Sequence, residues 1–195
     1  MRPKDPEIVE RNHRMKETKR IDRILKYEAH RVKVYEDILE QSDGTILHYD
    51  YVKNRDGAAV LLVDENEDVI FVRQYRSVED KVILEIPAGV SEPEDPSTEV
   101  TALREAEEET GLIPGRMKLI GNITNAVGLF DEHTAVYVGK DLKKGVRNLD
   151  PEEAIDLVKM PFSEALSKVY TGEIYDGKTV ISILGYQDLK TRKIF

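Results

Sequence analysis

Three short apolar runs between residues 57 and 86 constrain the fold more than any other feature of the sequence. The first, AAVLLV, is followed by the turn-like sequence ENED, and the other two, VIFVRQY and VILEI, come in close succession. Runs of this length that are bounded by turn signals are typical of buried strands. We therefore expect a mixed central sheet that is flanked by helices, which is an α+β architecture.

The rest of the chain supplies further elements. Strand-like sequences lie at 30–39, 45–53, 117–124, 134–138 and 154–160, and helical patterns lie at 163–170 and 178–190. The first two strand-like runs are joined by QSDGT, in which Asp43 and Gly44 are a hairpin-turn signal. We expect this hairpin to form a small antiparallel sheet of its own.

The length of 195 residues favours one domain with extensions, because a domain commonly holds about 150 residues. Residues 1–28 are strongly polar and are expected to form an accessory arm, in which Asp5 and Pro6 could open a helix. Residues 29–56 would form an N-terminal β-hairpin region, and residues 57–195 would form the main domain.

Charge and composition exclude several classes of partner. The formal net charge of -9 argues against nucleic acid and against an anionic membrane surface. This negative charge would also repel a small anionic substrate, unless a metal cation bridged the substrate and the protein. The chain has no cysteine, its longest aliphatic run is far shorter than the roughly 20 residues of a membrane span, and its N-terminus lacks the apolar segment of a secretory signal. A soluble protein of the cytoplasm is expected.

One short helical segment, LREAEEETGL at 103–112, carries an unusual density of glutamate. At about 100° per residue, Glu105, Glu108 and Glu109 share roughly 100° of the helix circumference, whereas Glu107 points away. Arg104 lies one turn before Glu108, where it can orient that carboxylate. The helix is expected to begin behind Asp95 as N-cap and to stop at Gly111.

Like charges three or four positions apart each cost a helix a few tenths of a kcal/mol, so the glutamates need compensation. A solvated acidic face is the ordinary interpretation of such a helix. The alternative is Mg²⁺, which takes oxygen ligands and typically bridges one or two carboxylates to substrate phosphates. The PAG sequence at 87–89 would bring backbone carbonyls near the helix, and Gly89 allows a close backbone approach.

Gly89, the acidic loop after it and REAEEETGL at 104–112 resemble the Nudix box, the signature of hydrolases that act on a nucleoside diphosphate linked to another group. The second half of the box matches the family pattern at every defined position. The first half departs from it, because Arg104 lies one residue further from Gly89 than in the family. Glu94 and Asp95 share the place of the loop glutamate, which puts the shape of the loop in doubt.

Four further stretches resemble the branch of this family that splits ADP-ribose and related nucleoside diphosphate sugars. They are VRQYR at 72–76, LEIPAG at 84–89, GLFDE at 128–132 and GEIYDGKT at 172–179. The resemblance implies a Nudix-like α/β/α sandwich and an Mg²⁺-dependent pyrophosphohydrolase that releases a nucleoside monophosphate and a sugar phosphate. It also implies a homodimer that exchanges its N-terminal sheets. Tyrosines near that sheet could stack on the base, namely Tyr27, Tyr35, Tyr49 and Tyr51.

The resemblance assigns roles to residues of this chain. The metal ligands would be the carbonyl of Ala88 and the carboxylates of Glu105 and Glu109, with Glu108 nearby, and Mn²⁺ could replace Mg²⁺. Glu132, in the GLFDEHT turn, would be the general base, with Asp131 or a helix glutamate as alternatives.

Arg104 and Glu108 would belong to the catalytic set. Arg76 would steady the diphosphate, and Glu85 would either bind the substrate as well or have a structural role. Arg73 lies an odd number of positions from Arg76, so it faces the other side of the strand.

Two other interpretations stay open. The chain could be a Nudix-fold sensor that binds ADP-ribose or another nucleotide without cleaving it. Alternatively, the enzyme could prefer GDP-mannose, UDP-glucose or a dinucleotide, because the loops that form the pocket walls decide selectivity.

Overall fold

The computed structural model describes residues 17–29, 32–151 and 153–195. These residues form two units. The small unit comprises the described residues up to Asn54 together with Ala126–Asp131, and the main unit comprises Arg55–Asn125 and Glu132–Phe195. The helix expected near Asp5 and Pro6 lies outside the described residues.

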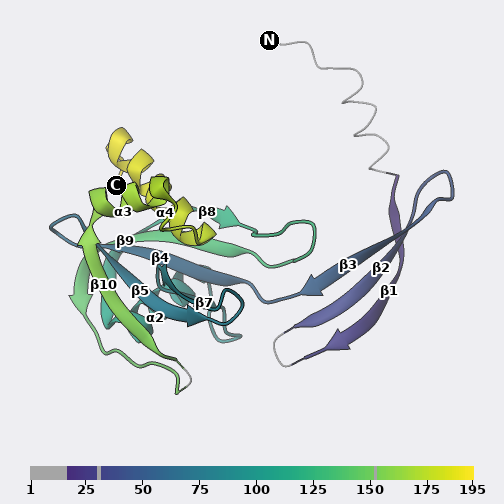
Figure 1. Ribbon diagram of the computed structural model, residues 1–195, viewed down its shortest axis with the longest axis horizontal. Helices are drawn as coiled ribbons and strands as arrows, with labels where there is room; N and C mark the ends of the chain where they lie inside the picture. The colour runs from purple at the N-terminus through teal and green to yellow at the C-terminus, as the bar shows by residue number, and fades with distance from the viewer. Residues whose placement is uncertain (1–16, 30–31, 152) are drawn as a thin grey trace, which may run out of the picture. The chain divides into compact units, whose positions relative to one another are not determined.

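The small unit is a three-stranded antiparallel sheet in the order β1 (Lys19–Glu28), β2 (Lys33–Glu40) and β3 (Ile46–Lys53) (Figure 1). Both strands expected from the sequence are present as β2 and β3. β1 was not expected, since its sequence was assigned to the polar arm. Two register irregularities interrupt its pairing with β2, so its apolar residues do not follow the period of two that marks a strand.

The main unit is built on a mixed sheet. Its strands are β4 (Gly57–Val63), β5 (Asp68–Arg76), β6 (Lys81–Glu85), β7 (Ala88–Val90), β8 (Leu112–Ile123), β9 (Thr134–Lys144) and β10 (Ile155–Pro161). Five strands follow the order β10-β5-β4-β9-β8, while β6 pairs with β5 and β7 pairs with β4. The pairing of β4 with β9 is parallel and the others are antiparallel, which confirms the expected mixed sheet.

The central strand β4 supplies side chains to both faces of the sheet. Ala58, Val60 and Leu62 pack in one cluster, which includes residues of helix α2 (Thr98–Thr110). Leu61 and Val63 pack in the opposite cluster. Since successive side chains of a strand point to opposite faces, an unbroken apolar run such as AAVLLV is suited to a strand that is covered on both sides.

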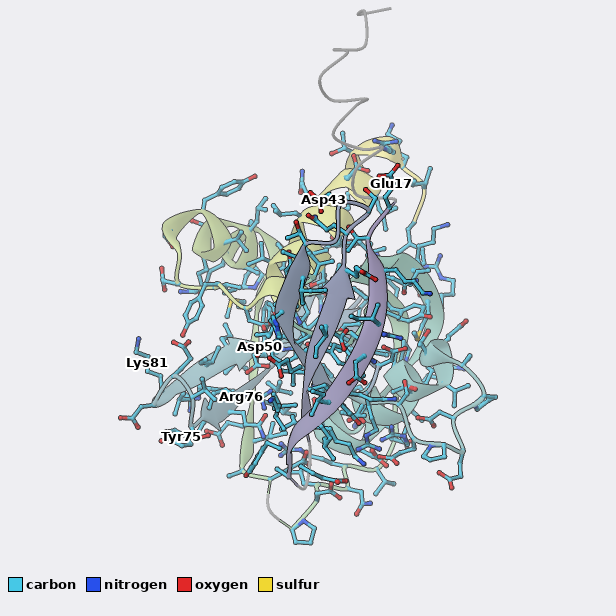
Figure 2. The ribbon with its side chains drawn as sticks, turned by 90° about the vertical axis from the view of Figure 1, so that its right-hand side faces the viewer. Glu17, Asp43, Asp50, Tyr75, Arg76 and Lys81 are labelled. Carbon is cyan, nitrogen blue, oxygen red and sulfur yellow. The ribbon has the colours of Figure 1, made fainter. Side chains whose placement is uncertain are left out.

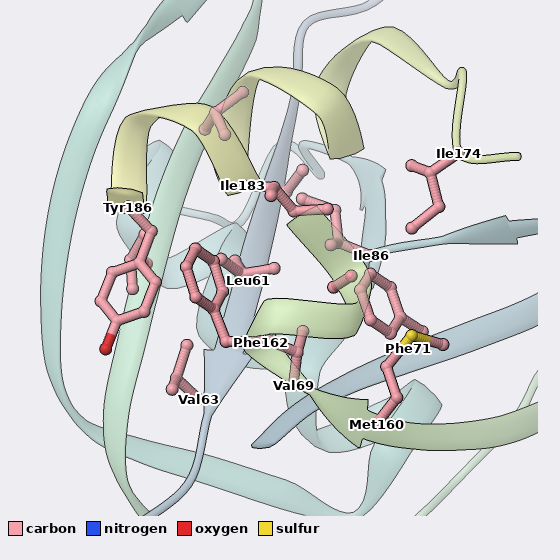
Figure 3. Close-up of a cluster of buried hydrophobic side chains, with 14 residues drawn as sticks. Leu61, Val63, Val69, Phe71, Ile86, Met160, Phe162, Ile174, Ile183 and Tyr186 are labelled. Carbon is pink, nitrogen blue, oxygen red and sulfur yellow. The ribbon is translucent and has the colours of Figure 1, made fainter. Parts of the chain in front are cut away.

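The cluster opposite α2 lies beneath helices α3 (Phe162–Thr171) and α4 (Gly177–Arg192) (Figure 3). Within this cluster the rings of Phe162 and Tyr186 meet edge to face, with their centroids 5.0 Å apart. With α2 on one face of the sheet and α3 and α4 on the other, the expected α/β/α sandwich is confirmed. No helix in the described parts of the chain is long and apolar enough to cross a membrane.

Helix α4 is fixed at both ends. At its N-terminus, Asp176 accepts a hydrogen bond from the backbone N–H of Thr179 at 3.1 Å, and the Thr179 hydroxyl oxygen accepts one from the backbone N–H of Ile86 at 3.0 Å. Near its C-terminus, Tyr186 donates to Glu67 in the β4–β5 turn at 2.9 Å. The bonds of Thr179 tie the first turn of α4 to the end of β6, and the bond of Tyr186 ties the second half of α4 to the β4–β5 turn.

Candidate active site

Helix α2 begins two residues later than expected. Its N-cap is Ser97, whose hydroxyl accepts a hydrogen bond from the backbone N–H of Val100 at 3.3 Å. Asp95, the expected cap, instead accepts hydrogen bonds from Arg104 at 3.1 Å and from the Thr101 hydroxyl at 3.0 Å. The Arg104 guanidinium holds the pKa of Asp95 at about 2. Asp95 therefore anchors the arginine of the glutamate helix rather than its backbone.

Arg104 orients two of the helix glutamates. Its Nη1 donates to Glu105 at 2.7 Å and to Glu108 at 2.9 Å, while its Nη2 also donates to the carbonyl of Val90 at 3.0 Å. Charge-assisted bonds of this kind hold a carboxylate in a defined direction. Glu107 points away from this group, as expected, and accepts a hydrogen bond from the backbone N–H of Val146 at 3.1 Å.

Two of the glutamates are buried together. Glu109 is 5% exposed and the Glu105 side chain is 12% exposed. Burial raises the pKa of Glu105 to about 7 and, with repulsion from Glu105 added, raises the pKa of Glu109 to about 8. The backbone N–H of Ala88 donates to Glu109 at 3.2 Å and offsets this only in part. Two acidic groups of like charge are thus held where their ionised forms are costly.

The backbone at Gly89 lies directly against this pair. A Cβ atom at this position would be 2.1 Å from Oε1 of Glu105, closer than any two such atoms can approach. Only glycine lets the strand β7 backbone pass so near the carboxylate. The structure thus brings together Ala88, Gly89, Glu105 and Glu109, as the sequence analysis expected.

The chemistry of these donors fits a hard divalent cation. Carboxylate oxygens are its preferred ligands, and a cation would compensate the repulsion between the buried acids. In residues 17–29, 32–151 and 153–195, no three acidic or histidine side chains already stand in a metal-binding arrangement. Arg104 binds one oxygen of Glu105 and one of Glu108, so each carboxylate could offer its second oxygen to an ion while the arginine holds it in place.

Without a divalent cation, the free energy of unfolding is expected to fall as the pH rises from about 4.5 to about 8. Both buried glutamates have higher pKa values in the folded chain than when unfolded, so the folded state binds more protons in this window and weakens as they leave. We expect a loss on the order of 5 kcal/mol, measured by urea denaturation in chelator. The free energy of unfolding of Glu109→Gln should fall less over the same pH range. A free energy of unfolding of the unmodified chain that stays constant or rises with pH would contradict the assignment.

A pocket of about 720 Å³ in the main unit holds a second group of charges. Arg76, at the end of β5 beside Tyr75, donates from Nε and Nη2 to the two oxygens of Glu85 at 2.6 and 2.7 Å (Figure 2). Lys178 donates to Glu85 at 2.6 Å. The Glu85 side chain is only 4% exposed. Glu85 therefore holds two cations at this pocket.

The charge of the buried acids acts on a residue of this pocket, Arg76. The pKa of Arg76 is raised above its usual range chiefly by its hydrogen bond to Glu85, and the negative charge of Glu109 contributes to the same shift. Arg73 lies elsewhere, in an ion pair of 2.8 Å with Asp156 on β10. Arg73 and Arg76 thus have different surroundings, as their odd separation along the strand predicts.

The two neighbouring acids of the GLFDE turn belong to different units. Asp131 lies in the small unit, where it accepts hydrogen bonds from the Tyr51 hydroxyl and from the backbone N–H of Asn54. Glu132 lies in the main unit, lines the pocket with Arg76 and accepts a hydrogen bond from Asn125 at 3.3 Å. Asp131 is engaged in holding the turn, so Glu132 is the acid of this turn that faces the pocket.

Two charged residues of the site were missed by the sequence analysis. Glu153 lies near enough to the buried pair that its charge helps to raise the pKa of Glu105 and of Glu109. It follows the strand β9 in a loop without periodic pattern, so the sequence offers only its acidic neighbourhood as a signal. Lys178 was interpreted only as part of a helix start, because its reach toward Glu85 depends on how α4 packs beside β6.

Comparison with known proteins gives consistent results. The model of the NUDIX domain matches residues 53–180. A methanol dehydrogenase activator from Bacillus methanolicus is 37% identical, and an ADP-ribose pyrophosphatase from Bacillus subtilis is 34% identical; each alignment covers 78% of this chain and 83% of the relative. A GDP-mannose pyrophosphatase from Klebsiella pneumoniae is 33% identical over 73% of this chain and 77% of its own length.

A solved structure, described as the crystal structure of an ADP compounds hydrolase, superposes with a TM-score of 0.80. The match covers 90% of this chain and 96% of the other, at 19% identity. At that identity the likeness speaks for the fold alone.

Proposed function

The chain belongs to the Nudix family, and we propose that it hydrolyses the diphosphate bond of ADP-ribose or a related nucleoside diphosphate sugar. The observation that carries the proposal is the buried pair Glu105 and Glu109. Both side chains belong to the Nudix-box helix and lie against the Ala88–Gly89 backbone of β7. The relatives named as pyrophosphatases for ADP-ribose and for GDP-mannose support this substrate class.

Nudix hydrolases use divalent metal ions, and we propose Mg²⁺ here, with Mn²⁺ as a substitute. Glu105, Glu109 and the carbonyl of Ala88 would hold the ion, with Glu108 close by. A bound divalent cation supplies neutralisation of the charge that develops on the phosphate oxygens during cleavage.

Side chains of this chain would transfer the proton and position the reacting groups. Glu132 takes the proton of the attacking water, whose oxygen forms a bond to one phosphorus while the bridging P–O bond breaks. Arg76, held by Glu85, positions the diphosphate, and Arg104 keeps Glu105 and Glu108 in place. The bridging oxygen leaves with its electron pair on the second phosphate, and ADP-ribose would thus give AMP and ribose 5-phosphate.

The direct experiment is a panel of ADP-ribose, GDP-mannose and UDP-glucose incubated with the full chain and Mg²⁺, with products separated by ion-exchange chromatography. We expect a nucleoside monophosphate and a sugar phosphate from at least one of them, formed in equal amounts. Absence of turnover with all three, at enzyme concentrations that bind the substrates, would refute a hydrolase.

A second candidate function rests on one observation. The relative of 37% identity is named for activating a dehydrogenase, which points to a chain that acts on another enzyme. A protein of this kind could read ADP-ribose as a signal without cleaving it. Binding of ADP-ribose in calorimetry, without any AMP formed, would favour that candidate over the hydrolase.

Gly89→Ala is expected to lower kcat/KM for ADP-ribose about 100-fold, because a misplacement near 1 Å at a reacting centre has an effect of this size. The added Cβ would displace the Glu105 carboxylate, whereas the flexible glutamate can move without unfolding the chain. The control is Gly121→Ala, where a Cβ meets no atom within 4 Å. A lower kcat/KM of Gly89→Ala than of Gly121→Ala, at equal thermal midpoints, would support the assignment. Full activity of Gly89→Ala would contradict it.

We also propose a homodimer that forms through the small sheet. The apolar face of a sheet is normally buried against another element, and apolar side chains of this sheet are exposed to solvent within the described residues of the single chain. They are Ile21, Ile24, Leu25, Tyr27, Ile46 and Tyr49. Light scattering should give about twice the chain mass of 22.3 kDa, and a monomer at micromolar concentration would argue against the dimer.

A further inference from the structure

We propose that Arg147 is a positioning residue of the active site, which fixes the loop after β9 against the C-terminal end of helix α2. The proposal rests on the hydrolase function proposed above. It concerns a residue that lies outside the Nudix box and outside the pocket of Arg76. Arg147 belongs to the loop that joins β9 to β10 in the main unit.

The beginning of this loop, residues 145–148, is bound to the end of α2. The backbone N–H of Gly145 donates to the carbonyl of Gly111 at 2.8 Å. The backbone N–H of Asn148 donates to the carbonyl of Glu108 at 2.9 Å. The last carbonyls of an α-helix have no partner within the helix, so this segment supplies donors that water would otherwise provide.

The side chain of Arg147 adds a bond at each end of the loop. Its Nε donates to the carbonyl of Glu109 at 2.7 Å, and its Nη2 donates to the carbonyl of Ile155, the first residue of β10. A guanidinium can hold two acceptors at once, because its N–H groups point in fixed directions. Its positive charge also lies at the negative end of the helix dipole. Arg147 thus joins α2 to the start of β10.

The position of the loop matters because the loop carries an acid of the site. The charge of Glu153 acts on Glu105 and on Glu109. The Glu153 carboxylate accepts a hydrogen bond from the backbone N–H of Asp150 at 3.0 Å, and the Glu153 N–H donates to the carbonyl of Asp150 at 2.9 Å. Since Arg147 binds the helix on one side and β10 on the other, it sets the place of this turn relative to the buried pair.

Capping of the helix does not account for both bonds of Arg147. Gly111 already ends α2, with a φ of 70° and an N–H that donates to the carbonyl of Glu107 at 2.7 Å. One hydrogen bond would satisfy the carbonyl of Glu109. The second bond, to Ile155, adds nothing to the helix and fixes the loop instead.

The test compares Arg147→Met and Arg147→Lys with the unmodified full chain. In calorimetry with a non-hydrolysable α,β-methylene analogue of ADP-ribose, Arg147→Met should raise the Kd for Mg²⁺ roughly 10- to 100-fold, as expected when a group that orients a metal ligand is lost. In steady-state hydrolysis of ADP-ribose, kcat should fall roughly tenfold. KM should change less than about threefold, because Arg76 still positions the diphosphate.

Arg147→Lys separates the two bonds from the charge. Lysine keeps the positive charge at the helix end, but its ammonium group does not reproduce the fixed fork that reaches both carbonyls. We therefore expect the Kd for Mg²⁺ to stay at least about threefold above that of the unmodified chain. Full recovery by lysine would show that the charge alone matters, and it would overturn the proposal.

Arg116→Met is the matched control, because Arg116 lies on the neighbouring strand β8 and pairs with Asp141 at the surface. This variant should keep both the Kd for Mg²⁺ and kcat. Hydrogen exchange in chelator gives a readout without metal or substrate, since the amides of Gly145 and Asn148 should exchange faster in Arg147→Met than in the unmodified chain.

An unchanged Kd for Mg²⁺ in Arg147→Met, even with faster amide exchange, would overturn the proposal, because it would leave Arg147 with a role in stability alone. If Arg147→Met does not fold, the Kd of Arg147→Lys decides by the same criterion. Absence of Mg²⁺ binding or of hydrolysis in the unmodified chain would instead refute the hydrolase function itself.

Discussion

Glu109→Gln is expected to lower kcat for ADP-ribose about 10³-fold, the largest effect of any single substitution considered for this chain. Glutamine preserves the size of the side chain and can still accept the hydrogen bond from Ala88. It removes the negative charge that a cation would bind. Steady-state kinetics at saturating Mg²⁺, with the thermal midpoint of each variant, measures the effect.

The same substitution should not destabilise the metal-free chain at neutral pH. Burial and repulsion from Glu105 raise the pKa of Glu109 to about 8, so removing the carboxylate relieves a cost. Glu107→Gln is the matched control on the same helix, because Glu107 faces away and binds the backbone of Val146. We expect its kcat within about threefold of the unmodified chain. Equal losses in both variants would mean that the effect is not specific to the buried pair.

Glu132→Gln is expected to lower kcat by a similar order, about 10² to 10³-fold, since a positioned general base contributes in this range. Its KM should change little, because Arg76 supplies the contact to the diphosphate in the proposed site.

Glu153→Gln tests the other acid near the buried pair. If Glu132 is the base, Glu153→Gln should reduce kcat less than about tenfold, through its electrostatic effect on Glu105 and Glu109. A large loss of kcat in Glu153→Gln, with little change in Glu132→Gln, would indicate that Glu153, in the loop after β9, is the general base. Asp131→Asn is expected to affect stability more than kcat, because Asp131 binds Tyr51 and Asn54.

The features that sequence could predict are those with strong local patterns. The unbroken apolar run of β4 required cover on both faces, and α2 and α4 supply it. The spacing of Glu105, Glu108 and Glu109 placed their carboxylates on one side of a helix, where Arg104 meets two of them. Gly111 ends this helix at a φ of 70°, a conformation in which glycine is favoured.

The features that sequence missed depend on packing between distant segments. The strand β1 is interrupted by two register irregularities, so its pattern does not alternate. Asp95 was expected to cap α2, but its bond to Arg104 outweighs the local preference. Glu85 was expected to face the substrate, and only the approach of β5, β6 and α4 determines that both of its oxygens are taken by cations.

The central claim is that the buried carboxylates of α2 bind the divalent cation through which a diphosphate is held for cleavage. Isothermal titration calorimetry of Mg²⁺ into the full chain, with a non-hydrolysable α,β-methylene analogue of ADP-ribose present, tests it most directly. The account predicts binding by the unmodified chain and none by the Glu105→Gln/Glu109→Gln double variant. Equal binding by both proteins, or no binding by the unmodified chain, would contradict it.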